Sequence, residues 1–193
     1  ILAYPISGTP FADHHSAFFS LIGVYFILIC IKKESKNLSF FIPIFFVLGF
    51  MSKQVPSTYL IFSITPIFLF YIFYNNKLFL LPNFIYGITF SVLILFIFGA
   101  ITGINFNNFI EQYILYPQSI ASNRLDNFTI KILGVLGNFK FVFLSLIILI
   151  IANLKKIKSG KIFEKNNFNV FIVVISTLIL IFHQLLTRNQ IFI

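Results

Sequence analysis

Long apolar runs separated by short polar connectors restrict the fold of this chain more than any other feature. A helix that crosses a bilayer needs roughly 17–25 predominantly apolar residues. The candidate runs lie at about 16–31, 38–51, 56–74, 82–101, 132–153 and 168–186. They lack the alternation of barrel strands. We therefore expect an all-α, multi-pass transmembrane helical bundle of about six spans, forming a single domain over residues 1–193.

The composition excludes a water-soluble protein. Hydrophobic residues make up 59% of the chain and charged residues only 10%, whereas soluble domains carry about 25% charged residues. The net charge of +9 comes mostly from lysines in the connectors. The positive-inside rule explains this charge, so we expect no nucleic-acid partner. The single cysteine, Cys30, excludes a disulfide within one chain.

The positions of the lysines predict how the spans are oriented. Lysines fall in the connectors after the first, third and fifth runs, which share one side of the membrane. Under the positive-inside rule this is the cytoplasmic side. We expect the bacterial inner (plasma) membrane, with membrane lipids as partners and a site that faces the periplasm or outside. The lysines concerned are Lys32, Lys33, Lys36, Lys77, Lys155, Lys156, Lys158, Lys161 and Lys165.

Chemically varied side chains gather on the opposite, outer side. Polar groups from several helix ends on one leaflet are typical of a site at the membrane–water boundary, and the cations among them suit a phosphate. The alternative is that the outer loops are simply polar and form no binding site. The residues are Asp13, His14, His15, Lys53, Gln54, Glu111, Tyr113, Tyr116, Arg124, Asp126, His183 and Arg188.

Asp13, His14 and His15 stand together where a polar stretch enters the first run. Ionisable groups at a membrane boundary are costly unless they pair or line a polar cavity. A divalent metal site is one alternative, but no second ligand cluster accompanies it, and we expect no metal and no cofactor. Another alternative is that Asp13 or Ser16 is the N-cap of the first helix.

Cations on the outer side predict where a substrate phosphate binds. Lys53 and Gln54 form the turn between the second and third runs, and an outer lysine opposes the charge bias of the loops. Tyr116 and Arg124 resemble a loop that presents a guanidinium to a phosphate, and Arg188 follows the last run. The alternatives are a snorkelling lysine and plain surface arginines.

Residues 104–125 form a segment that is too polar to cross the membrane. Its apolar residues at 106, 109, 110, 113 and 114 share one helical face. We expect an amphipathic helix in the outer interface. Such a helix either roofs a lipid-substrate cavity or is a plain connector.

Two stretches carry a family resemblance over about the first third of the chain. Residues 11–19, FADHHSAFF, resemble a helix that begins with Asp and runs into Phe and Leu. Residues 48–56, LGFMSKQVP, resemble a Gly-x-x-x-Leu-x-Lys-Gly-Pro-like turn, with Gln54-Val55 where Gly is usual. The likeness is to the GT-C superfamily of polyprenol-phosphate-sugar glycosyltransferases, in the branch of protein mannosyltransferases and the lipid A aminoarabinose transferase.

This resemblance implies an inverting transfer of a hexosyl or pentosyl group from a polyprenol-phosphate-linked sugar to a lipid or glycan acceptor. It also implies that Lys53 and Arg124 stabilise the departing phosphate, with Asp13, His14 and His15 in supporting roles. The general base is an acidic residue in an outer loop upstream of these helices. We therefore expect the chain to be a fragment, cut at both ends, without its main catalytic acid.

Two other classes of function stay open. A lipid or solute transporter, or a flippase, places ionisable residues near the bilayer midplane with broken helices. Lys140 inside the fifth run and a kink expected at Pro66 are the signs of it in this chain. A non-catalytic membrane scaffold is the third class.

Overall fold

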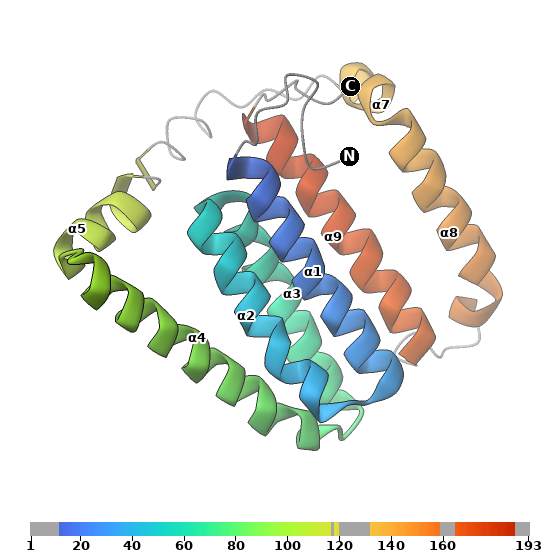
Figure 1. The fold of residues 1–193 in the computed structure, drawn as a ribbon. Coiled ribbons are helices and arrows are strands. Elements are labelled where there is room, and N and C mark those ends of the chain that lie inside the picture. Colours follow the sequence, from blue (N-terminus) through green and yellow to red (C-terminus); the bar gives the residue numbers. More distant parts are fainter. Residues whose placement is uncertain (1–11, 117, 120–131, 159–164, 188–193) are drawn as a thin grey trace.

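The structure, a computed structural model, describes residues 12–116, 118–119, 132–158 and 165–187 (Figure 1). Within these ranges every regular element is a helix, which confirms the expected all-α class. The elements are α1 (Ala12–Lys33), α2 (Lys36–Ser52), α3 (Gln54–Tyr74), the 3-10 helix η1 (Leu78–Leu80), α4 (Leu81–Thr102), α5 (Phe106–Ile110), the π-helical η2 (Glu111–Leu115), α7 (Ile132–Asn138), α8 (Lys140–Lys158) and α9 (Lys165–Thr187).

Within the described residues, four helical stretches are long and apolar enough to cross a membrane, which indicates a membrane protein. They are His14–Lys33, Gln54–Tyr74, Leu78–Thr102 and Asn167–Leu186. α2 has 17 residues, which at about 1.5 Å per residue gives a helix shorter than a hydrocarbon core of about 30 Å. The apolar part of α8, Lys140–Asn153, is also short. Of about six expected spans, four therefore remain as candidates within the described residues, and the expected number of six is not confirmed.

The expected fifth span, at 132–153, is divided in the structure. α7 ends at Asn138 and α8 begins at Lys140, so two helices replace one. Gly137 and Asn138 are poor helix formers, which accounts for a break at this point. α3, in contrast, continues through Pro66, where a kink was expected.

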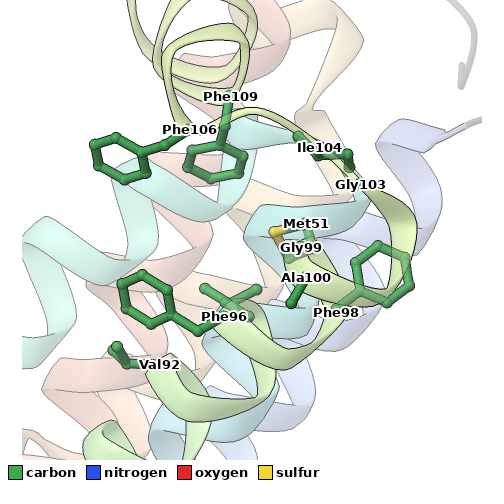
Figure 2. Close-up of a pocket in the computed structure, with 11 residues that line it drawn as sticks. Met51, Val92, Phe96, Phe98, Gly99, Ala100, Gly103, Ile104, Phe106 and Phe109 are labelled. Carbon is green, nitrogen blue, oxygen red and sulfur yellow. The ribbon is translucent and has the colours of Figure 1, made fainter.

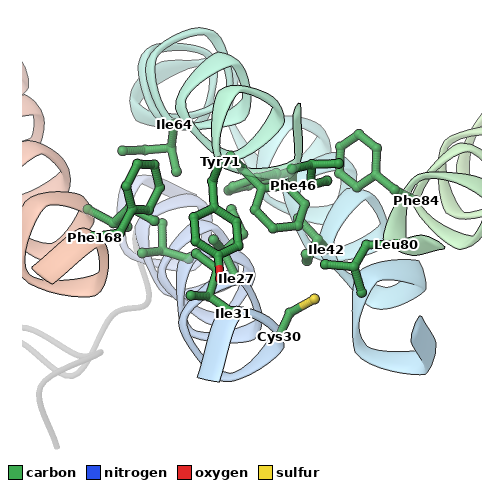
Figure 3. Packing of buried hydrophobic residues seen from close by; sticks show 14 of the residues in the cluster. Ile27, Cys30, Ile31, Ile42, Phe46, Ile64, Tyr71, Leu80, Phe84 and Phe168 are labelled. Carbon is green, nitrogen blue, oxygen red and sulfur yellow. The ribbon is translucent and has the colours of Figure 1, made fainter. Parts of the chain in front are cut away.

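Helices α1, α2, α3 and α9 lie side by side in one bundle, with α4 packed on α2 and α8 packed on α9 (Figure 1). Buried aliphatic and aromatic side chains from the bundle and from the start of α4 meet in one cluster (Figure 3). The Tyr71 ring centroid lies 4.9 Å from that of Phe168, which joins α3 to α9. Close packing of this kind holds helices together inside a bilayer, where burial from water contributes little.

The second half of α4 leaves the bundle. Its buried residues are Phe84, Gly87 and Ser91, all in the first half of the helix. A Cβ atom added to Gly87 would overlap the carbonyl oxygen of Phe40, so α4 crosses α2 at backbone contact there. Beyond Ser91 the two helices diverge (Figure 1).

The connectors before α2 and before α4 lie at one end of the bundle. Lys77 Nζ, in the second connector, lies 2.8 Å from Glu34 Oε2 in the first. Both side chains are about a third exposed, and an exposed ion pair contributes about 0–1 kcal/mol. The pair nevertheless confirms that these two lysine-bearing connectors share a side. The start of α1 and the α2–α3 turn lie at the opposite end (Figure 1).

Candidate functional site

The turn between α2 and α3 follows from its own sequence. Pro56 disfavours helical backbone at the residue before it, and Val55 is extended, with φ −113° and ψ 128°. Lys53 is also extended, with φ −163° and ψ 137°, and its N–H donates to the Gly49 carbonyl oxygen at 3.1 Å. The chain therefore reverses with Lys53 and Gln54 at the tip.

Serine hydroxyls bind the start of α1 to this turn. Ser16 Oγ donates to the main-chain carbonyl oxygen of Lys53 at 2.7 Å. The same hydroxyl lies 2.7 Å from Ser57 Oγ, which in turn lies 2.7 Å from Ser20 Oγ. All three serines are buried. Because a buried hydroxyl is costly unless it is hydrogen-bonded, this network fixes α1 against the turn.

Because Gly49 has no side chain, the serine hydroxyls have space to meet beside it. A Cβ atom added there would lie 2.5 Å from Ser20 Oγ and 2.6 Å from Ser57 Oγ. Sequence reasoning missed Gly49, Ser20 and Ser57 as parts of the site. The signal was the spacing of Ser16 and Ser20, since small residues four apart on a membrane helix mark a close helix contact.

The serine network brings the two predicted motifs together. His14 and His15, in the first turns of α1, and Lys53 and Gln54, in the turn, all lie at one end of the bundle and are half-buried. Asp13 is in the same turn of α1 as the histidines, but its side chain lies outside the described residues. The clustering of these residues was expected from the sequence, and their hydrogen-bonded connection was not.

The N-cap alternative for the start of α1 is wrong. α1 begins at Ala12, so Asp13 and Ser16 both lie inside the helix. Ser16 uses its hydroxyl on Lys53 and Ser57 instead of on a free N–H of its own helix. Its role is therefore to join helices.

Helix α9 adds a third histidine near this end of the bundle. His183 is buried, and its ring centroid lies 6.2 Å from that of Tyr59 in α3. Tyr59 follows the Lys53 turn by less than two helical turns. His183 therefore lies toward the same end of the bundle as the Lys53 turn, with which the sequence grouped it.

The remaining predicted substrate-binding residues belong to other parts of the chain. Arg124 and Arg188 lie outside the described residues. Tyr116 is exposed at the end of the helical segment formed by α5 and η2, at the α4 edge of the bundle (Figure 1). That segment rests on α2 through Tyr113, whose ring centroid lies 6.4 Å from that of Phe50.

The described part of the site has a lysine and two histidines at the same end of the bundle. A lysine ammonium is a compact charge that donates hydrogen bonds to phosphate oxygens, and an imidazole accepts and releases protons. Among the described residues, no group of three or more His, Cys, Asp or Glu side chains is arranged to hold a metal ion.

No family model, curated protein or solved structure matches this chain. Its function is therefore inferred from the residues at the α1 start and the Lys53 turn. Their contact is a feature of this chain's own geometry.

Proposed function

We propose that the chain is the membrane part of a glycosyltransferase that moves a sugar from a polyprenol-phosphate donor to a lipid or glycan acceptor on the outer side of the membrane. Lys53 stabilises the lipid phosphate as it departs, and Gln54 and Tyr116 contribute donors. Asp13, His14 and His15 take supporting roles at the same site. Arg124 and Arg188 supply further cations for the phosphate.

The observation that carries this proposal is the bond between Ser16 Oγ and the Lys53 carbonyl oxygen. It holds the residues 11–19 motif and the residues 48–56 motif against each other, although more than 30 residues of sequence separate Ser16 from Lys53. A lysine and histidines brought to one end of the bundle suit a reaction in which negative charge builds up on a leaving phosphate. A connector whose residues only contact solvent would not need a buried hydrogen-bond network of this kind.

The transporter alternative gains no comparable support. Its main sign was Lys140, interpreted as a cation within a span. Lys140 is instead the first residue of α8, where its ammonium lies 5.2 Å from the centroid of the Phe141 ring. A lysine at a helix end reaches the interface with its charged group, so it marks no path through the bilayer.

The proposal requires the Lys53 end to face outward, and two asparagines test this orientation. Asn37 and Asn108 are both exposed and lie toward opposite ends of the helical bundle. The native Cys30 is buried. In spheroplasts, we expect a membrane-impermeant maleimide to label the Asn108→Cys variant at once. The Asn37→Cys variant should react only after permeabilisation. The reverse pattern would contradict the proposed orientation.

Sugar transfer itself is measured with the native gene product in membranes. Polyprenol-phosphate donors carrying labelled hexoses or pentoses are supplied together with an outer-leaflet lipid extract. We expect labelled sugar to appear in the acceptor fraction while polyprenyl phosphate is released in equal amount. Unchanged donor, together with flux of a lipid or solute across the same membranes, would sink the transferase proposal and favour the transporter.

A further inference from the structure

An apolar cavity of about 530 Å³ lies where α4 diverges from α2 (Figure 2). The second half of α4 forms one wall, through residues such as Phe96 and Gly99. Met51, near the end of α2, lies on the opposite side, and Phe106 and Phe109 of α5 close the cavity from above. The cavity is separate from the serine network and from the histidines described above.

The backbone holds this cavity open. α4 is pressed against α2 only as far as the Gly87 crossing, so its second half leans outward. Gly103, with φ 67°, ends α4 in a left-handed conformation that favours glycine. The chain then turns back over the gap, where the Phe109 ring stacks on Tyr113 at 4.8 Å. The Tyr113 ring centroid in turn lies 6.4 Å from that of Phe50 in α2, so aromatic contacts anchor the roof to the bundle.

The lining determines what kind of molecule fits. Every lining side chain is aliphatic, aromatic or methionine, or the residue is a glycine. An apolar cavity does not hold water stably, and its walls lose dispersion contacts while it is empty. The volume lies within the range of about 300–1,000 Å³ typical of ligand pockets. Since α4 is one of the membrane-crossing helices, hydrocarbon chains reach the cavity directly from the bilayer.

The lining also indicates which class of lipid supplies the hydrocarbon chain. Among the described residues that line the cavity, none is charged, so a headgroup gains no selectivity from them. Occupancy then follows the abundance of each lipid by mass action. Phospholipids form the bulk of a bilayer, and Lys53 and Gln54, which bind polyprenyl phosphate under the proposed function, are not among the residues that line the cavity.

We propose that this cavity is a lipid-binding site that holds one acyl chain of a bilayer phospholipid between α4, the end of α2 and the α5 roof. The bound chain fills the space between the diverging helices and braces the roof against them. This inference is independent of the proposed sugar transfer and stands or fails separately from it.

Two glycines provide a matched pair of variants. A Cβ atom added to Gly99 or to Gly137 meets no atom within 4 Å, so a larger side chain is accommodated at either position. Gly99 lines the cavity, whereas Gly137 lies in α7. Gly99→Leu therefore fills the site, and Gly137→Leu is its control. Ala100→Leu narrows the same cavity from the next residue and replaces Gly99→Leu if that variant does not fold.

The experiment uses the full chain in nanodiscs with a phosphatidylethanolamine that carries a diazirine within one acyl chain. After illumination, we expect labelled peptides to concentrate at residues 92–109 in the wild type and in Gly137→Leu. Labelling there should fall several-fold in Gly99→Leu. Equal labelling of these residues in Gly99→Leu and the wild type would overturn the site. Loss of the label on adding a trace of polyprenyl phosphate would overturn the choice of phospholipid.

A stability measurement gives an independent readout. In detergent, added phospholipid should raise the unfolding temperature of the wild type and of Gly137→Leu, because a ligand that binds the native state stabilises it. Gly99→Leu should show a clearly smaller rise. An equal rise in all three proteins would mean that lipid acts elsewhere on the surface and would also overturn the proposal.

Discussion

A Gly87→Ala substitution is expected to separate α4 from α2 and to lower the stability of the whole chain. The added Cβ would overlap the Phe40 carbonyl oxygen and lie 3.2 Å from Pro43 Cδ. Backbone cannot rotate away as a flexible side chain can. Overpacking typically costs about 1–3 kcal/mol and occasionally more. For a chain of this length, each kcal/mol lowers the unfolding temperature by roughly 2–4 °C.

Gly99→Ala is the matched control, since it makes the same change in the same helix. Its Cβ meets no atom within 4 Å, so only helix propensity changes, and replacing glycine by alanine in a helix gains up to about 1 kcal/mol. Unfolding in detergent should therefore occur several degrees lower for Gly87→Ala and at the same temperature or slightly higher for Gly99→Ala. Equal unfolding temperatures for the two variants would contradict the close crossing of α2 and α4.

The sequence predicted the positions of most helices because apolar length alone sets them in a membrane. It did not predict how the helices pack. α1, α3 and α4 are apolar around their whole circumference, so no stripe distinguishes the packed face from the lipid-facing one. The small residues carried that information instead. Gly87 and Ser91 lie on the buried face of α4, at the spacing of a close helix contact.

The candidate site was predicted in outline only. Charge placement assigned Asp13, His14, His15 and Lys53 to one end of the bundle, and the structure places the backbone of all four there. The hydroxyl network behind them depends on distances below 3 Å that join α1 to α3 and to the α2–α3 turn. Residue spacing along the sequence does not predict such distances. The break in the expected span at 132–153 was missed because the span was assigned from its hydropathy, and the low helix propensity within it was given no weight.

A Lys53→Ala substitution is expected to abolish most sugar transfer while leaving the fold intact. The contact that holds the turn is made by the Lys53 main-chain carbonyl with Ser16 Oγ, and alanine keeps that carbonyl. What is lost is the ammonium that stabilises the departing phosphate. Removing one group that stabilises developing negative charge typically lowers kcat by about 10²–10³-fold. Lys53→Arg, which keeps the charge with a different shape, should retain part of the activity.

Lys77→Gln is the matched cation control at the other end of the bundle. It removes a lysine whose ion pair with Glu34 is about a third exposed, so the expected loss of stability is about 0–1 kcal/mol. Transfer should remain near the wild-type rate. A comparable loss of transfer in Lys77→Gln and Lys53→Ala would mean that charge removal harms the protein in general.

The rate of sugar transfer from a polyprenol-phosphate donor, compared between Lys53→Ala and Lys77→Gln membranes at equal protein content, tests the proposed function most directly. The account predicts a rate about 10²–10³-fold lower in the Lys53→Ala membranes, with both proteins unfolding at similar temperatures. Wild-type transfer by Lys53→Ala would contradict the assignment of the α1 start and the Lys53 turn as the site of reaction.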